Sequence, residues 1–127
     1  MSITIEGIEA EKKARLLLKK HGWYIQQLDW IGKKNNQWVI FEIKNRELFQ
    51  PPPFVGTGLD ISQIYLRNNL LKELQLRTML IVFIKGTDDI YYQYLDILEK
   101  DKYFDTKNGI RIFPLTSYCH SEVTLIV

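Results

Sequence analysis

Residues 37–44, with the sequence QWVIFEIK, constrain the fold of this chain more than any other segment. Successive side chains of a β-strand point to opposite faces, so one face of this segment would be wholly apolar, formed by Val39, Phe41 and Ile43. The other face begins with Trp38 and Ile40 and ends with an acid, Glu42, and a base, Lys44. We therefore predict a strand that carries two charged side chains at one end, beside otherwise buried surface.

A turn signal at residues 32–36 precedes this strand and predicts a hairpin. If Asn35 and Asn36 form a two-residue turn, in which asparagine tolerates positive φ, Asp29 lies opposite Glu42. Two opposed carboxylates destabilise a strand pair unless a cation lies between them, and Mg²⁺ prefers such oxygen ligands. The alternative is a three-residue turn, which would place Asp29 opposite Phe41 on the other face.

The remaining pattern predicts one α/β domain over residues 1–127, with a central mixed β-sheet flanked by helices. The periodicity indicates helices at 6–21, 59–74 and 95–102, and extended segments at 23–31, 78–84, 90–94 and 110–115. Residues 49–58 contain three consecutive prolines and predict an exposed loop. Residues 86–127 form a C-terminal extension of the core. The three tryptophans are interpreted as core or edge-strand packing: Trp23, Trp30 and Trp38.

Two polar residues occupy apolar stripes of the predicted helices, and we expect each to have a polar partner inside the fold. Glu11 borders the stripe of the first helix, which consists of Ala10, Ala14, Leu17 and Leu18. Gln63 lies within the stripe of the second helix, which consists of Leu59, Leu66, Leu70 and Leu74. Alternatively, Glu11 bridges to Arg15 on its own helix, and Gln63 belongs to a capping arrangement that begins at Asp60.

Bulk charge does not indicate nucleic-acid binding, because 17 Lys and Arg stand against 15 Asp and Glu. Positive charge is nevertheless concentrated in the first 50 residues. The candidate phosphate contacts are Lys12, Lys13, Lys33, Lys34 and Arg46.

The longest apolar run, residues 79–84, is too short to cross a membrane, so no membrane association is expected. Residues 1–6 lack the features of a secretory leader, which favours a cytoplasmic protein, including a phage protein in its host's cytoplasm. A single cysteine, Cys119, with two histidines offers neither an intramolecular disulfide nor a structural zinc site.

Asp29 is followed in the sequence by Glu42-Ile43-Lys44, and these residues lie between a predicted helix with Glu11 and a predicted helix with Gln63. This order resembles the PD-(D/E)XK nuclease superfamily. Its core has the element order αβββαβ and is called restriction-endonuclease-like. The opening residues 7–11, GIEAE, most resemble Holliday-junction resolvases and related small phage or archaeal nucleases. The resemblance spans about residues 5–85, and Leu28 stands where the family has proline.

The resemblance implies Mg²⁺-dependent hydrolysis of DNA phosphodiester bonds, with Mn²⁺ able to substitute and with branched DNA as a candidate substrate. It assigns the metal to Asp29, Glu42, the Ile43 carbonyl and Glu11. Lys44 would orient or deprotonate the attacking water, and Gln63 would position water or phosphate. A homodimer is expected, because symmetric cutting of two strands needs two sites related by a two-fold axis.

Two other hypotheses stay open. In the first, the same fold is a catalytically silent DNA-binding or assembly module whose opposed acids are vestigial. In the second, the chain binds a protein partner through the proline loop and its tyrosines.

Overall fold

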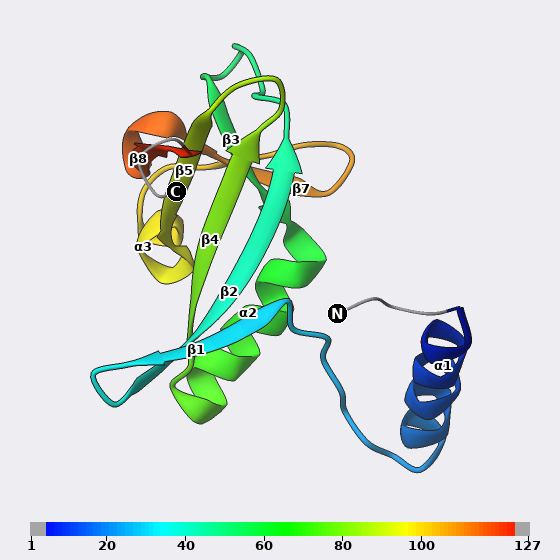
Figure 1. Cartoon of the computed structure of the whole chain (residues 1–127). Helices are drawn as coiled ribbons and strands as arrows, with labels where there is room; N and C mark the ends of the chain where they lie inside the picture. The colour runs from blue at the N-terminus through cyan, green and yellow to red at the C-terminus, as the bar shows by residue number, and fades with distance from the viewer. Residues whose placement is uncertain (1–4, 124–127) are drawn as a thin grey trace.

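A computed structural model describes residues 5–123. The two ends of the predicted domain, residues 1–4 and 124–127, lie outside the described residues. Most of residues 1–6, which lack the features of a secretory leader, therefore also lie outside them. In chain order the elements are α1 (Ile5–Lys20), β1 (Trp30–Lys34), β2 (Gln37–Arg46), β3 (Gly56–Asp60), α2 (Ile61–Leu74), β4 (Arg77–Ile84), β5 (Asp89–Tyr94), α3 (Leu95–Lys100), β6 (Phe104–Asp105), β7 (Ile110–Pro114), the 3₁₀ turn η1 (Leu115–Ser117) and β8 (Cys119–Glu122) (Figure 1). No helix among the described residues is long and apolar enough to cross a membrane.

Five strands form the central sheet, in the order β1-β2-β4-β5-β8. β2 and β4 run parallel and the other neighbours run antiparallel, so the predicted mixed sheet is confirmed. One face of this sheet packs against α2, α3 and the second sheet, through a core that includes Ile64, Leu80, Val82, Leu98 and Phe113. The second sheet has the order β3-β7-β6, so the third strand of the expected αβββαβ order lies outside the central sheet.

The hairpin between β1 and β2 has the two-residue turn that the sequence favours. Asn35 and Asn36 have φ values of 52° and 60°, the left-handed conformation that asparagine tolerates. Lys34 pairs with Gln37 and Ile31 pairs with Ile40. This register rules out the three-residue alternative and directs Asp29 toward Glu42.

The predicted boundary between the proline loop and the second helix is wrong. Residues 56–60 form β3, whereas the sequence pattern predicts a loop to residue 58 and a helix from residue 59. β7 approaches so closely that a Cβ at Gly56 or Gly58 would overlap the carbonyl of Phe113 or Arg111. Only glycine fits at positions 56 and 58, so these two glycines permit β3 to pair with β7.

The later start of α2 changes the face that this helix buries. Its fully buried residues are Ile64 and Arg67. Leu74, a member of the predicted leucine stripe, is 63% exposed, and Leu59 belongs to β3. The predicted stripe is therefore wrong, and a charged residue occupies the helix face that contacts the sheet.

The C-terminal part completes both sheets instead of standing apart as an extension. β5 and β8 belong to the central sheet, and β7 pairs with β3. The strands predicted at 90–94 and 110–115 and the helix that begins at residue 95 are present, whereas β6 and β8 were not predicted. The Tyr118 hydroxyl donates a 2.7 Å hydrogen bond to the carbonyl of Thr57, which ties this region to β3.

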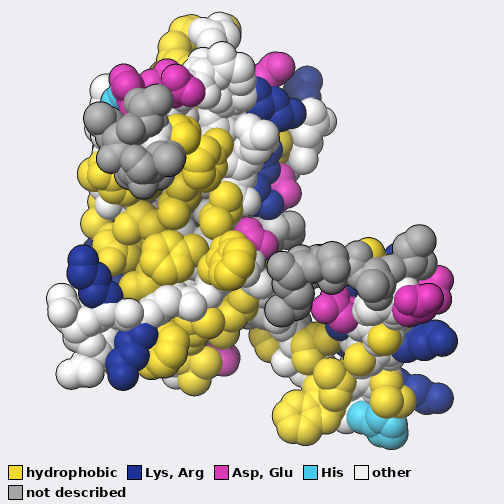
Figure 2. Space-filling model, viewed as in Figure 1, with side chains coloured by type: hydrophobic (Ala, Val, Ile, Leu, Met, Phe, Trp, Pro, Cys, Tyr) yellow, Lys and Arg dark blue, Asp and Glu magenta, His cyan; other side chains and the backbone are white. Residues whose placement is uncertain are grey.

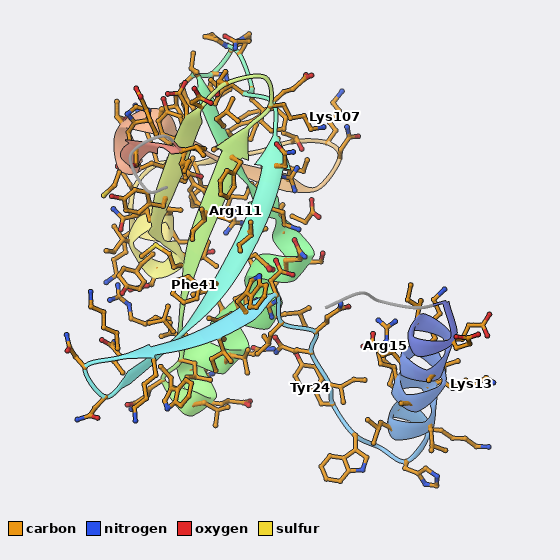
Figure 3. All side chains as sticks on the ribbon, in the orientation of Figure 1. Lys13, Arg15, Tyr24, Phe41, Lys107 and Arg111 are labelled. Carbon is orange, nitrogen blue, oxygen red and sulfur yellow. The ribbon has the colours of Figure 1, made fainter. Side chains whose placement is uncertain are left out.

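α1 stands away from the rest of the molecule (Figures 1 and 3). It ends before Gly22, whose φ is 86°, as predicted, and residues 23–29 form no regular structure. Every described side chain from residue 6 to residue 24 is exposed. Trp23, Trp30 and Trp38 are 65%, 66% and 49% exposed, so none belongs to the core, although Trp30 lies on the edge strand β1.

Candidate functional site

Two carboxylic acids meet at the start of the β1–β2 hairpin. Glu42 lies on the covered face of β2 and is 1% exposed. Asp29 directly precedes β1, and its Oδ2 accepts a 3.0 Å hydrogen bond from the backbone N–H of Ile43. The Asp29 and Glu42 carboxyl groups are hydrogen-bonded to each other. The structure thus brings together two of the predicted site residues, and the backbone of a third.

The environment pushes the pKa values of these acids apart. Burial raises the pKa of Glu42, and the hydrogen bond to Asp29 raises it further, although Arg67 and Lys44 oppose the shift. Burial alone would also raise the pKa of Asp29, but the hydrogen bonds from Glu42 and the Ile43 N–H, with the positive charges of Lys44 and Arg67, leave it lowered. Of the two acids, Glu42 is therefore the one that takes up a proton more readily.

Arg67, which the sequence reasoning missed, holds Glu42 in place. Its Nη2 lies 3.1 Å from Glu42 Oε1 and donates to the Gln27 carbonyl at 2.8 Å, while its Nη1 donates to Gln26 Oε1 at 2.8 Å. Arg67 is 4% exposed, so this is a buried ion pair. The sequence contains one signal that could have identified Arg67. It follows Gln63 by four residues, which places both side chains on the same face of a helix.

Two ion pairs fix how α2 lies along β2. Arg46 Nη2 is 3.6 Å from Oδ1 of Asp60, the residue directly before α2, and Glu42 contacts Arg67 on the helix. The two elements therefore run in opposite directions, and Lys44 and Gln63 lie between the two pairs. Lys44 is half-buried, and its charge acts on both Asp29 and Glu42.

Among the described residues, two predicted site residues have a buried side-chain atom without a hydrogen-bond partner, Gln63 at Oε1 and Arg46 at Nε. The Oε1 of Gln63 is buried and accepts no hydrogen bond from the described residues. Asp60 makes no side-chain cap bond at the start of α2, so the capping explanation of Gln63 is wrong. A buried amide oxygen beside Lys44 without a protein partner is suited to bind water or a ligand there.

A cationic basin adjoins Lys44 where the parallel strands β2 and β4 end. The cavity measures about 590 Å³ and is lined by Lys44, Asn45, Arg46, Glu47, Leu48, Phe49 and Lys85. The backbone N–H of Lys85 donates to the carbonyl of Arg46 at 2.9 Å, which fixes the two strand ends side by side. Three cations against one acid make the basin suited to an anion.

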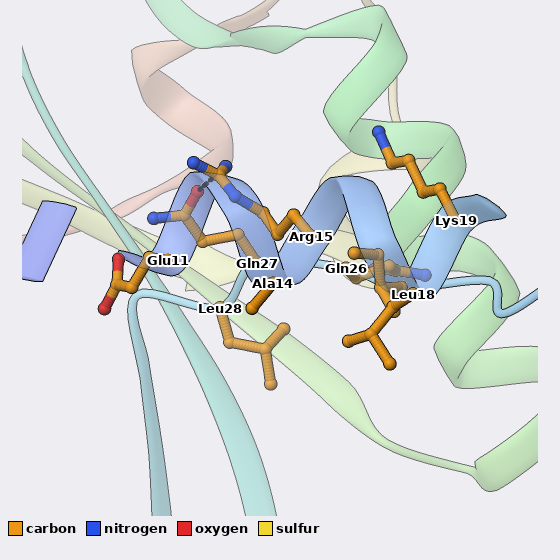
Figure 4. A pocket seen from close by; sticks show the side chains of 9 residues that line it. Glu11, Ala14, Arg15, Leu18, Lys19, Gln26, Gln27 and Leu28 are labelled. Atoms are coloured by element: carbon orange, nitrogen blue, oxygen red, sulfur yellow. Dashed lines mark hydrogen bonds between the residues drawn. The ribbon is translucent and has the colours of Figure 1, made fainter. Parts of the chain in front are cut away.

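Glu11 lies apart from the acid pair. It borders a hollow of about 600 Å³ between α1 and residues 25–28, which Ala14, Leu18 and Leu28 also line (Figure 4). Arg15 donates from Nη1 to Gln27 Oε1 at 3.4 Å, and no ion pair joins it to Glu11 in the described chain. No three His, Cys, Asp or Glu residues in the range 5–123 gather closely enough to hold a metal.

The five predicted phosphate contacts do not form one surface. Lys12 and Lys13 lie exposed on α1, and Lys33 and Lys34 lie at the hairpin end of β1. Arg46 lies at the opposite end of β2, where it lines the cationic basin.

The residues present fit a divalent cation. The pair supplies two carboxylates that repel each other when both are ionised, and Gln63 Oε1 lacks a partner among the described residues. A hard cation between the two acids would relieve this repulsion. Asp29, Glu42 and the Ile43 carbonyl are the candidate ligands.

Metal stabilisation should depend on pH, because protons compete with the cation for Glu42, whose pKa is raised. The contribution of Glu42 to stability falls as pH rises from the ordinary value of 4.5 through the raised value. The rise in Tm caused by Mg²⁺ should therefore be larger at pH 8 than at pH 5.5, as measured by differential scanning fluorimetry. Glu42→Gln should remove the difference, and an equal Mg²⁺ effect at both pH values would contradict this competition at Glu42.

No family model matches the sequence, and no curated protein matches it either. Among solved structures, the chain is similar to Hjc, a Holliday junction resolvase from the archaeal hyperthermophile Archaeoglobus fulgidus. The TM-score is 0.47 and the sequence identity is 10%, over 94% of this chain and 98% of that chain. The assignment of site residues rests on the geometry described above.

Proposed function

We propose that the chain is a Mg²⁺-dependent DNA endonuclease of the PD-(D/E)XK type, acting on branched DNA. The observation that carries this proposal is the hydrogen-bonded pair of Asp29 and Glu42 with Lys44 beside it, at the register that the sequence spacing requires. Two acids and a lysine next to an open cationic basin supply the groups needed to hydrolyse a phosphodiester.

Each residue then has a distinct role. Asp29, Glu42 and the Ile43 carbonyl hold Mg²⁺, which when bound polarises the phosphate and lowers the pKa of a water molecule. Lys44 orients or deprotonates the attacking water and adds positive charge where negative charge develops. Gln63 Oε1 accepts a hydrogen bond from that water. Arg67 acts through Glu42 as a positioning residue, and Glu11 joins as an additional carboxylate only if α1 moves.

The substrate would enter over the cationic basin. Lys44, Arg46 and Lys85 line this basin, which supports a role for them as contacts to phosphates of the strand being cut. The lysines of α1 and of the hairpin, Lys12, Lys13, Lys33 and Lys34, would contact more distant phosphates. Binding should consequently weaken steeply between low and moderate salt. A homodimer would present two such sites, as a four-way junction requires.

The test is cleavage of end-labelled linear, single-stranded, flap and four-way-junction DNA with Mg²⁺, Mn²⁺ or EDTA. We expect cutting that requires metal, prefers a branched substrate and disappears in Asp29→Asn, which keeps the side-chain shape without the charge. Wild-type protein that binds DNA but cuts none of these substrates with either metal would refute the nuclease. Cutting that survives EDTA would refute the metal site.

A specific observation favours a second candidate, the catalytically silent DNA-binding module. Arg67 already neutralises Glu42 at 3.1 Å, so the buried acid has a structural partner without any metal. Melting discriminates between the two candidates, because a silent module gains no Tm from Mg²⁺ or Mn²⁺, whereas a metal site gains stability that Asp29→Asn removes.

A further inference from the structure

One face of the central sheet is apolar, and no helix of residues 5–123 covers it. On β2, β4 and β5 the side chains that point away from α2 and α3 form what we name the open face: Phe41, Ile43, Met79, Ile81, Phe83 and Tyr92. The strand register places Phe41 beside Met79, and Ile81 between Ile43 and Tyr92, so these side chains form one continuous surface. Figure 2 shows it as a broad hydrophobic area.

The side chains of the open face are mostly apolar, like those of a hydrophobic core, but they are only partly buried. Ile43 is 37% exposed, and a hollow of about 290 Å³ lies over the surface, lined by Ile43, Ile81, Phe83, Ile90, Tyr92 and Ser121. A sheet that is apolar on both faces is normally covered on both, because each uncovered face leaves hydrophobic surface in water. In residues 5–123 no helix packs on this side (Figure 1).

α1 likewise has an apolar surface that is exposed in the structure. Its apolar stripe includes Leu17 and Leu18, which are 57% and 40% exposed. The helix has 16 residues, a length at which an isolated helix is only marginally stable in water. Its lysines at positions 12, 13, 19 and 20 lie away from this stripe, so the stripe can be buried while they remain in solvent.

The link between α1 and the sheet directs the helix away from its own open face. Gln26 Nε2 donates to the Leu66 carbonyl at 2.9 Å, and Arg67 donates to Gln26 and to the Gln27 carbonyl, so the link is fastened to α2 on the covered side. Five residues, 21–25, separate Gln26 from the helix and span at most about 18 Å. α1 therefore stands beyond the β1 edge (Figure 1).

We propose that two copies of this chain exchange α1, so that the helix of each copy covers the open face of the other. This arrangement gives both unpartnered surfaces a partner, whereas direct stacking of two open faces would leave both helices bare. A two-fold exchange makes two equal helix-on-sheet contacts, and both add to the roughly 1,200–2,000 Å² that a stable interface buries. The inference builds on the homodimer of the proposed function and names its interface.

Cross-linking between differently tagged chains tests the exchange. In a Cys119→Ala background, one chain carries Ala14→Cys, in the centre of the stripe, and a chain of different size carries Ile81→Cys. After joint unfolding and refolding, a short bis-maleimide should join the two chains. The matched control is Leu16→Cys with Ile81→Cys, which should give at most a tenth of that product, because Leu16 lies on the opposite side of α1.

Sedimentation gives a second readout. We expect a wild-type dimer whose Kd rises at least about 100-fold in Leu17→Glu, since each dimer would bury two carboxylates, and stays within about threefold in Leu16→Glu. Both positions are exposed in the single chain, so both variants should keep the wild-type circular dichroism spectrum.

Three outcomes would overturn the exchange. They are a monomeric wild type, a cross-link within a single chain that carries both cysteines at high dilution, and an Ile81–Ile81 product without the Ala14–Ile81 product. DNA cleavage is measured separately: an exchanged dimer that cuts nothing would refute the nuclease and keep the interface, whereas a monomer that cuts would do the reverse.

Discussion

Lys44→Ala is expected to lower kcat for Mg²⁺-dependent DNA cleavage by at least about 100-fold, the size of effect seen when a preorganised charge is removed from an active site. Lys44 is half-buried, and its charge acts on both Asp29 and Glu42, so its ammonium group is placed where the attacking water and the developing charge would lie. The proposed metal ligands, Asp29 and Glu42, are unchanged in this variant. The measurement is the single-turnover cleavage rate, with the Mg²⁺-induced rise in Tm recorded in parallel.

Lys85→Ala is the matched control for this experiment. It removes a cation from the same basin but at a position that contacts no acid of the pair. It should raise KM and leave kcat within about tenfold. If Lys44→Ala also keeps kcat within tenfold while KM rises, Lys44 is only a phosphate contact, and its catalytic assignment is wrong.

The second large effect concerns stability. Arg67→Met should lower the free energy of unfolding by about 3–5 kcal/mol, because it leaves Glu42 buried without its charged partner. The variant also removes the hydrogen bonds to Gln26 and to the Gln27 carbonyl. Urea denaturation followed by circular dichroism measures the loss. Because a protonated Glu42 tolerates burial better than a carboxylate, the loss should be smaller at pH 5 than at pH 8.

Lys72→Met on the same helix serves as the control. Lys72 is exposed, so its replacement should change the free energy of unfolding by no more than about 0.5 kcal/mol. A double-mutant cycle with Glu42→Gln isolates the pairwise coupling of Arg67 and Glu42. Additive effects of the two substitutions would show that the ion pair contributes nothing and that Arg67 acts through its other hydrogen bonds.

The part of the site that the sequence predicts is the part governed by local geometry. A two-residue turn at Asn35-Asn36 determines which residues face each other, and alternation along β2 determines which face Glu42 and Lys44 share. Both rules act over a few residues, so the pair of acids could be placed without knowledge of the rest of the fold.

The missed features depend on contacts between distant segments. β3 exists because β7 approaches glycines that, read locally, indicate a loop. Arg67 resembles any helical arginine until α2 begins at Ile61 and turns it toward Glu42. Neither contact has a local pattern, since each depends on where a remote backbone lies.

The first helix shows a different limit. Its apolar stripe correctly predicts an amphipathic helix, but a stripe does not specify the surface that it meets. The resemblance to the nuclease superfamily assigns Glu11 to the metal, which requires α1 to lie beside the acids. In the structure, the fastening of Gln26 and Gln27 to α2 directs the helix elsewhere.

The second sheet has a consequence for the order in which the chain becomes structured during synthesis. β3 pairs with β7, yet α2, β4, β5 and α3 all lie between them in the sequence. A ribosome must therefore release nearly the whole chain before β3 and β7 can pair, and pairing of such remote segments is slow. Until Arg111 and Phe113 reach Gly58 and Gly56, β3 has no partner strand. We expect the nascent protein to be sensitive to proteases around residues 56–60, and to become resistant only after β7 has left the ribosomal tunnel.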